Sequence, residues 1–228
     1  LGRRAGRLAG VSEFNARELR ELSGRPAEVI PVLFDRAALG SPGPAEPPGP
    51  PTVLFVGRLA PHKRQDLVIH AFARYRRREP AARLVLVGTA LNQEFEAGLR
   101  ALAERLAPGA VSFETGGIAP AQLDQRYRSA HAFLCLSEHE GFGIPLLEAL
   151  HYGVPVIARD AGAVGEVLGD AALLLGPEDD VATAGEALSL VIADRELRSE
   201  LRARGGRRLK VYDSARTAAK LRAAVESL

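Results

Sequence analysis

The sequence predicts an α/β fold with a doubly wound, Rossmann-like parallel sheet, followed by a helical C-terminal tail. From position 52 onward, short apolar runs alternate with amphipathic segments, which is the pattern of parallel strands joined by crossover helices. The last part, residues 180–228, has helical character throughout. We therefore expect one sheet domain over residues 52–228, with helices at its C-terminal end.

The chain ahead of the sheet divides into two segments. Residues 1–35 predict a helical lead-in, with Ser12 as a candidate N-cap and a short extended piece, AEVIPVL, at residues 27–33. Residues 36–51 contain too much Pro and Gly for a helix or a central strand. We interpret them as a linker or surface loop.

Six short apolar runs are the strand candidates, at residues 52–56, 83–87, 110–113, 132–136, 155–158 and 171–175. Amphipathic segments separate them. In the segment 66–78, for example, apolar side chains occupy one stripe and arginines the opposite face. Six strands with intervening helices fit one doubly wound domain.

Composition excludes some classes of partner. The 228 residues are 46% hydrophobic and 25% charged, which is enough to bury the core of one large domain. The formal net charge of +2 is close to balanced, aromatic residues make up only 5%, and Trp is absent. A nucleic-acid-binding surface needs basic and aromatic residues together, so we expect no nucleic-acid partner.

The single cysteine, Cys135, excludes an internal disulfide and favours a reducing compartment. Its apolar surroundings predict a buried core residue rather than a catalytic thiol. No apolar run approaches the roughly 20 residues that span a bilayer, and we find no signal peptide, so we expect a cytoplasmic protein. Arg3, Arg4 and Arg7 leave peripheral contact with an anionic membrane open, beside the simpler role of solvating the chain.

The most informative stretch is residues 137–151, SEHEGFGIPLLEALH, where a Gly-Phe-Gly loop precedes a helical pattern that Pro145 opens. Glycines let the main chain approach a ligand closely, and the free amides and partial positive charge of a helix N-terminus favour a phosphate. Glu140 and Glu148 can both face a ligand there, and carboxylates accept hydrogen bonds from sugar hydroxyls. The pattern predicts a sugar phosphate as the ligand.

Other loops add groups at the carboxyl ends of the strands, where such sheets bind ligands. The first loop, GRLAPHK, offers a glycine turn at Gly57, and Arg58 and Lys63 can clamp two phosphate groups. Their alternative role is that of surface charges. The loops at residues 88–89, 114–118 and 160–166 converge on the same edge.

Two histidines and a third glutamate accompany this edge. His62 has the ordinary interpretation of a surface residue, whereas His139, next to Glu140, can lie near a bound sugar. Glu166, after DAGAVG, either caps a helix or lines the rim of the pocket. Acid pairs such as Glu140 and Glu148 can also be solvated helix faces, and only their combination with the other loops favours a site.

These motifs occur in an order that resembles a known family. FVGRLAPHK, a strand ending in VG, a loop ending in GGI, SAHAFLCLSEHEGFGIPLLEAL and GVPVIARDAGAVGEVL are together similar to the C-terminal, donor-binding domain of retaining GT-B glycosyltransferases of family four, the glycosyl transferases group 1. The resemblance covers about residues 52–228. It implies the C-terminal half of a GT-B fold.

The resemblance implies roles for matching positions. Arg58 and Lys63 would contact the donor diphosphate. Glu140 would be catalytic, meeting the transferred sugar or the reaction centre, and Glu148 would take the ribose hydroxyls. The other substrate-binding positions would cradle the phosphates or lie against the base, and they are Gly57, Gly117, Ile118, Gly141, Phe142, Gly143, Ile144 and Leu146. Such enzymes need no metal or other cofactor, and this chain has no D-x-D pair suited to a divalent ion.

The resemblance also implies a missing part. A GT-B enzyme has a second, N-terminal domain that supplies the acceptor site, and residues 1–35 resemble a remnant of the interdomain segment, although VIPVLFD stands where relatives often read VIPNGVD. The chain has no Met and begins with Leu1. We expect a fragment, inactive alone, whose partners are a nucleotide sugar and the missing acceptor domain.

Three functions remain in view. The first is transfer of a sugar, with retention, from a nucleotide-diphosphate sugar to an unknown acceptor, with the leaving group stabilised by Arg58, Lys63 and the helix dipole. The second is a non-catalytic nucleotide-sugar-binding module, which would need Glu148 but not Glu140. The third is a dinucleotide oxidoreductase, which needs a G-x-G-x-x-G turn where this chain has GRLAPHK. The first fits the residues best.

Overall fold

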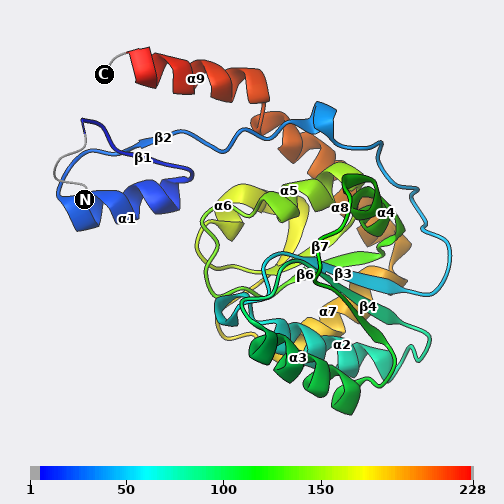
Figure 1. Ribbon diagram of the computed structural model, residues 1–228. Helices are drawn as coiled ribbons and strands as arrows, with labels where there is room; N and C mark the ends of the chain where they lie inside the picture. Colours follow the sequence, from blue (N-terminus) through cyan, green and yellow to red (C-terminus); the bar gives the residue numbers. More distant parts are fainter. Residues whose placement is uncertain (1–5, 227–228) are drawn as a thin grey trace.

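The computed structural model describes residues 6–226, and its main body is a six-stranded, all-parallel sheet with helices on both faces (Figure 1). The strands are β3 (Thr52–Val56), β4 (Arg83–Val87), β5 (Val111–Glu114), β6 (Ala132–Cys135), β7 (Val156–Arg159) and β8 (Ala172–Leu175). Their order across the sheet is β5-β4-β3-β6-β7-β8. The chain therefore starts in the middle, builds outward to one side, and returns to build outward to the other. This is the predicted doubly wound sheet, and its topological switch point lies between β3 and β6.

Helices connect the strands and cover the two faces. One face carries α2 (Gln65–Arg76), α3 (Gln93–Leu106) and α7 (Val181–Ala193), and the other carries α4 (Pro120–Ser129), α5 (Ile144–Tyr152) and α6 (Val164–Leu168) (Figure 1). The helix α8 (Arg195–Arg208) packs against α5 and α7. Each crossover returns the chain to the same end of the sheet, so all the strands run in one direction.

The core consists of two apolar layers, one on each face of the sheet. In β3, Val53 and Phe55 belong to one layer and Leu54 to the other. Alternate strand residues point to opposite faces, and both faces are covered, which explains why the strands appear in the sequence as unbroken apolar runs. Cys135, in β6, is buried as predicted.

The lead-in forms a small unit of its own beside the main sheet. The helix α1 (Glu13–Ser23) lies between two short parallel strands, β1 (Ala9–Gly10) and β2 (Glu28–Val29). Ser12 caps α1 as predicted, because its Oγ accepts the Asn15 N–H at 3.1 Å. The last helix, α9 (Ser214–Glu226), lies beside this unit in Figure 1, and Arg7 Nη1 donates to the Ala224 carbonyl at 3.5 Å.

Some predicted boundaries differ from those observed. The extended piece 27–33 is a strand only at β2, and residues 36–51 contain one 3₁₀ turn, Arg36–Ala38, but no strand or α-helix. The tail is helical but interrupted by a 3₁₀ turn, Leu209–Val211, between α8 and α9. β5, β7 and β8 each begin one residue later than their apolar runs, because hydrogen bonding to neighbouring strands, and not apolarity, fixes where a strand starts.

No helix within residues 6–226 is long and apolar enough to cross a membrane. Two of the arginines that raised the question of membrane contact, Arg3 and Arg4, lie outside the described residues. Arg7 is described, and its guanidinium pairs with Glu28 at 2.9 Å. Peripheral membrane contact stays a prediction.

Candidate ligand site at the carboxyl edge of the sheet

The loops after β3 and β4 are joined where the strands end. The Leu59 N–H donates to the Thr89 carbonyl at 3.0 Å, and the Leu91 N–H donates to the Leu59 carbonyl at 2.8 Å. Gly88 has φ of 145°, and a Cβ placed there would lie 2.0 Å from the Gly57 carbonyl oxygen. Only glycine allows this approach of two main chains. The join holds the first loop, with Arg58, against the sheet.

Lys63 and Glu140 meet at the switch point. Lys63 ends the loop after β3, and Glu140 lies in the loop after β6; the Nζ–Oε1 distance is 2.7 Å, with 19% and 10% of the two side chains exposed. The Glu138 N–H also donates to the His62 carbonyl at 2.8 Å. Lys63 and Glu140 belong to different sequence motifs and lie 77 positions apart, yet they form one mostly buried ion pair.

Arg64 also joins these two loops, a role that its sequence context does not predict. It is the one non-glycine residue with a positive φ, 49°, among residues 6–226. Its guanidinium pairs with Asp66 at 3.0 Å and with Glu138. The hydrogen bond to Asp66 above all, and the one to Glu138, raise the pKa of Arg64. Its only sequence signal is its position next to Lys63.

Arg58 presents an unpaired cation. Gln65, which is buried, donates to the Arg58 carbonyl at 2.9 Å and so fixes its main chain. The Arg58 side chain itself is exposed, and none of the residues in the described range 6–226 forms a hydrogen bond or ion pair with its guanidinium. An exposed guanidinium without a partner on an ordered loop is available to a phosphate.

The N-terminus of α5 opens onto this edge. Gly143 is its N-cap with φ of 83°, and a Cβ there would lie 2.7 Å from Leu146 Cδ1, so the position requires glycine. Pro145 occupies the first turn, as the sequence predicts. The Leu146 N–H already donates to the Gly143 carbonyl at 2.9 Å, whereas Ile144 is exposed. The first amides of the helix give an anion a place to bind.

Gly141 and Phe142 make contacts that hold the loop in place, and their binding roles stay predictions. Gly141 does not have a positive φ; it is instead closely approached, because Ser12 Oγ donates to its carbonyl at 2.9 Å and a Cβ there would lie 3.2 Å from Asn15 Oδ1. Phe142 is 6% exposed and packs edge-to-face on Tyr212, with ring centroids 5.5 Å apart. The Gly-Phe-Gly loop is therefore held by the aromatic contact with Tyr212 and by the hydrogen bond from Ser12 of the lead-in.

Glu148 is held by a residue that sequence reasoning missed. Tyr127 Oη, from α4, donates to Glu148 Oε2 at 2.6 Å, and the Tyr127 ring stacks on Tyr152 with centroids 5.1 Å apart. Burial raises the pKa of Glu148, and the Tyr127 hydrogen bond opposes that rise. Burial also raises the pKa of Tyr127 well above its usual value, so it stays a donor. This hydrogen bond fixes one of the two carboxylate oxygens of Glu148 in place.

The remaining predicted positions lie on the same edge with fewer contacts. Gly117 has φ of 83° and is exposed, and a Cβ placed there would have no atom within 4 Å, whereas Ile118 is half-buried against the core. His62 is exposed, as predicted. His139 is exposed as well and packs edge-to-face on Phe14 of α1, with ring centroids 5.5 Å apart.

Glu166 links this edge to the lead-in. Its carboxylate accepts the Glu13 N–H at 2.8 Å and the Phe14 N–H at 3.1 Å, so it caps α1 rather than its own helix. The same loop contacts Glu140, because the Ala163 N–H donates to the Glu140 carbonyl at 2.8 Å. The expectation that Glu166 caps a helix is confirmed, but the helix lies more than 150 positions away in the sequence.

No group of three or more His, Cys, Asp or Glu side chains within residues 6–226 is placed to hold a metal ion. Independence from metals and other cofactors stays a prediction.

Comparison with known proteins gives a family match. The profile of the family described as Glycosyl transferases group 1 matches residues 41–208. The D-inositol 3-phosphate glycosyltransferase of Nocardia farcinica is 32% identical over 211 residues, which cover 84% of this chain and 46% of that protein. The GDP-mannose-dependent alpha-mannosyltransferase of Mycobacterium tuberculosis is 38% identical over 122 residues, 54% of this chain and 29% of that one. The chain spans about half the length of the first of these relatives.

Solved structures match the fold. Anabaena HepE in complex with UDP and glucose has a TM-score of 0.86 at 22% identity, over 98% of this chain and 64% of that one. Sucrose-phosphate synthase from Thermosynechococcus elongatus has a TM-score of 0.83 at 24% identity, over 99% of this chain and 59% of that one. Both matches include the lead-in as well as the sheet, so the arrangement of the whole chain recurs in larger proteins.

Proposed function

The chain belongs to the glycosyl transferases group 1, and from this premise we propose that it is the donor-binding part of a retaining glycosyltransferase. The observation that carries the proposal is the convergence at the switch point. Arg58 and Lys63 come from one motif, and Glu140 and the N-terminus of α5 come from another, yet all four lie at the one edge where a doubly wound sheet binds nucleotides. Their chemistry suits a nucleotide-diphosphate sugar.

The diphosphate would lie between the first loop and α5. Arg58 offers paired donors and has no partner within the described residues, and Lys63 offers a point charge. The amides at the start of α5 add a partial positive charge behind the Gly143 cap. A diphosphate would therefore contact the cations of the first loop on one side and the N-terminus of α5 on the other. Hydrogen bonds already fix the loops that carry these groups.

The sugars and the base would extend from there. Glu148, oriented by Tyr127, has one carboxylate oxygen left to accept ribose hydroxyls. Gly117 and Ile118 lie on the loop after β5 and would contact the base. Glu140 forms an ion pair with Lys63, and if Lys63 contacts the diphosphate, Glu140 would lie beside the sugar that is transferred.

Lys63 and Glu140 form an ion pair before any donor arrives. When the bond between the sugar and the diphosphate breaks, negative charge grows on the leaving phosphate, and the cations at Lys63 and Arg58 stabilise it. Glu140, whose carboxylate stays beside the transferred sugar, would in turn stabilise the positive charge that develops on the sugar. The lysine and the glutamate thus act on opposite charges of one transition state.

Names of relatives suggest the class of donor. One relative is called GDP-mannose-dependent, and HepE was solved with UDP and glucose. We propose a nucleoside-diphosphate hexose as the donor for this chain. The acceptor would be chosen by a second domain.

The small lead-in unit supports the proposal of a second domain. β1 and β2 have two residues each, and an isolated pair of parallel strands of that length is not stable in water. Leu22 and, on α9, Leu221 and Val225 are exposed apolar side chains, at 87%, 43% and 58%. We propose that the acceptor-binding domain continues this small sheet and covers these side chains.

Calorimetric titration with UDP, GDP and ADP tests the donor site. We expect one of them to bind, and Arg58→Ala and Glu148→Ala to weaken that nucleotide about tenfold or more, because hydrogen bonds to charged groups contribute about 1.5–3 kcal/mol. Arg83→Ala and Glu104→Ala are matched controls: both residues are exposed and lie away from the carboxyl edge. They should leave the affinity unchanged.

Glu140→Gln separates sugar transfer from simple binding. It should leave nucleotide affinity within a few-fold of the wild type but abolish transfer from the sugar-bearing donor by the whole protein. Equal weakening by the controls and by Arg58→Ala, or unimpaired transfer by the Glu140→Gln protein, would refute the proposal.

A further inference from the structure

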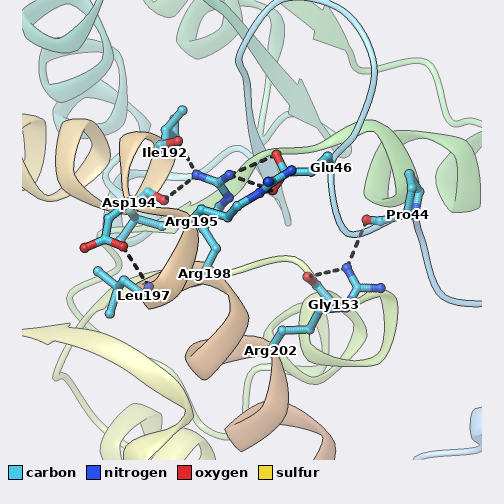
Figure 2. A network of polar contacts seen from close by, with 10 residues as sticks. Pro44, Glu46, Gly153, Ile192, Asp194, Arg195, Leu197, Arg198 and Arg202 are labelled. Atoms are coloured by element: carbon cyan, nitrogen blue, oxygen red, sulfur yellow. Dashed lines mark hydrogen bonds and ion pairs between the residues drawn. The ribbon is translucent and has the colours of Figure 1, made fainter.

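A cavity lies at the opposite, amino edge of the sheet. It has a volume of ≈ 280 Å³ and lies between the Pro-rich loop at residues 44–47, the end of α4, the turn after α5 and the start of α8. Figure 2 shows this region, with Glu46 on the loop facing Arg195 and Arg198 on α8 and with Arg202 reaching toward Pro44 and Gly153. None of the carboxyl-edge loops lines it.

The cavity is strongly positive. Its charged lining consists of Arg128, Arg195, Arg198 and Arg202 against the single carboxylate of Glu46, with His131 beside them. Arg195, Arg198 and Arg202 recur at helical spacing and so lie along one side of α8. Arg128 is exposed, and its guanidinium has no hydrogen bond or ion pair within the described residues. Four arginines line one small cavity, and positive charges gathered in this way repel one another unless anions balance them.

Glu46 shows how an oxyanion binds here. Arg198 Nη2 donates to both of its carboxylate oxygens, at 2.8 and 2.9 Å, and Arg195 Nε donates to one of them at 3.0 Å. These bonds lower the pKa of Glu46. A carboxylate forked by two arginines has the geometry that the same arginines would give a phosphate.

The Glu46 side chain can move away from the arginines without a change in the fold. Residues 44–51 read PAEPPGPP and form no strand or α-helix, and 45% of the Glu46 side chain is exposed. Arg202 holds the loop by its carbonyl groups, at Pro44 (2.9 Å) and Gly43 (2.5 Å), and so independently of Glu46. Moving the Glu46 side chain therefore needs no change in the fold.

We propose that the amino-edge cavity is a second binding site, which takes a small phosphorylated anion in place of the Glu46 carboxylate. A dianion would satisfy Arg195 and Arg198 and would also reach the charge of Arg128, which a single carboxylate leaves unbalanced. The volume suits a phosphate, a diphosphate or a phosphate ester of a small molecule, and it is below the range of pockets for larger ligands. A whole nucleotide sugar would not fit.

Pyrophosphate and inorganic phosphate are the probes. Because pyrophosphate would also bind the proposed donor site, the titrations use the Arg58→Ala protein as the background. In that background we expect Arg195→Ala and Arg198→Ala each to weaken pyrophosphate about tenfold. Glu46→Gln should tighten it about two- to fivefold, because a competing internal carboxylate is removed. Arg204→Ala, on the same helix but paired with Glu200, should change nothing.

The variants keep the test decisive. Arg198 also donates to the carbonyls of Val191 and Ile192 and so supports the fold, whereas the Arg195 side chain is 78% exposed and contacts only Glu46 among the described residues. A loss of affinity in Arg195→Ala therefore reports the site itself. Failure of the background protein to bind either probe at millimolar concentration, or equal affinity in Arg195→Ala and Arg204→Ala, would overturn the proposal. Either result leaves the nucleotide titrations untouched, so the two sites are tested separately.

Discussion

The two edges of the sheet hold charge in different ways. At the carboxyl edge, Lys63 and Glu140 come from different loops, the ion pair is mostly buried, and Arg58 is left unpaired by the described residues. At the amino edge, the arginines follow one another along α8, and a loop of the chain itself supplies the carboxylate of Glu46. In the proposals above, the carboxyl edge is a preformed site for an external ligand, whereas at the amino edge the carboxylate of Glu46 occupies the place that an anion would take.

The difference follows from how the main chain is held. Carboxyl-edge loops approach one another so closely that glycine is required, as at Gly88, and every one follows directly from a strand. At the amino edge, Gly43 has a main-chain hydrogen bond to the Tyr152 carbonyl at 3.0 Å, but residues 44–47 are held by side chains, among them the guanidinium of Arg202. Main-chain contacts fix the positions of the loops, whereas a contact made by a long side chain can be lost when that side chain changes rotamer. Tyr127 is common to both regions, because it lines the amino-edge cavity and also donates to Glu148.

The largest expected effect contrasts two glycines. Gly88→Ala would place a Cβ 2.0 Å from a carbonyl oxygen, and we expect it to lower the free energy of unfolding by about 3 kcal/mol or more. Gly153→Ala at the amino edge, with φ of 73°, would meet only the movable Arg202 guanidinium at 2.6 Å, and about 1–2 kcal/mol is expected.

Urea unfolding measures both. Gly98→Ala, inside α3 with nothing within 4 Å, is the control and should raise stability by about 0.5–1 kcal/mol. Equal losses in Gly88→Ala and Gly153→Ala would mean that the edges do not differ in rigidity.

The next effect concerns the mostly buried ion pair. Lys63→Met leaves Glu140, which is 8% exposed, without its cation, and we expect a loss of about 2 kcal/mol. The double variant Lys63→Met/Glu140→Gln should recover part of that loss, because no unpaired charge remains. Glu46→Gln at the amino edge should cause a smaller loss, because an exposed pair is screened by solvent. A Lys63→Met protein as stable as the wild type would show that solvent reaches Glu140 freely.

A smaller, local effect is expected at Glu166. Glu166→Ala removes the acceptor of two α1 amides, and losing a cap costs a helix about 0.5–2 kcal/mol. Amide hydrogen exchange should therefore quicken in residues 10–24 and stay unchanged in α7. Glu178→Ala is a control on an exposed acid elsewhere. Unchanged exchange in α1 would mean that the lead-in docks without this contact.

The pH dependence of stability should have opposite signs at the two edges. The pKa of Glu148 is raised by burial above its ordinary 4.5, so the folded state holds the extra proton and stability falls as pH rises above 4.5. The pKa of Glu46 is lowered by Arg198 and Arg195, so its contribution is present above 4.5 and is lost as pH falls.

Unfolding curves from about pH 3 to 8 check these signs. Glu148→Gln should flatten the decline above the ordinary glutamate pKa, and Glu46→Gln should flatten the weaker decline below it, since an exposed pair is screened by solvent. A change of the same sign in both variants would contradict the account.

Most strand ends were predictable to within one residue. The sheet is buried on both faces, so each strand appears in the sequence as a continuous apolar run. The positions at the carboxyl edge were also predictable as a group, since a residue just after a parallel strand must lie there. The roles of Tyr127 and Arg64 were not predictable, and neither was the identity of the helix that Glu166 caps, because these contacts join residues that are distant in sequence or depend on a side-chain bond that no spacing records. The cluster of arginines at the amino edge was not predicted either, because in the sequence the arginines of α8 look like an ordinary charged, solvent-exposed helix face.

Hydrogen exchange with and without the bound nucleoside diphosphate tests the central claim most directly. At a saturating concentration of whichever nucleotide binds in the calorimeter, the account predicts protection of residues 57–64 and 140–148 and no change in residues 40–51. Protection confined to residues 40–51, or absent from the loop and helix that hold Lys63, Glu140 and Glu148, would contradict the assignment of the carboxyl edge as the donor site.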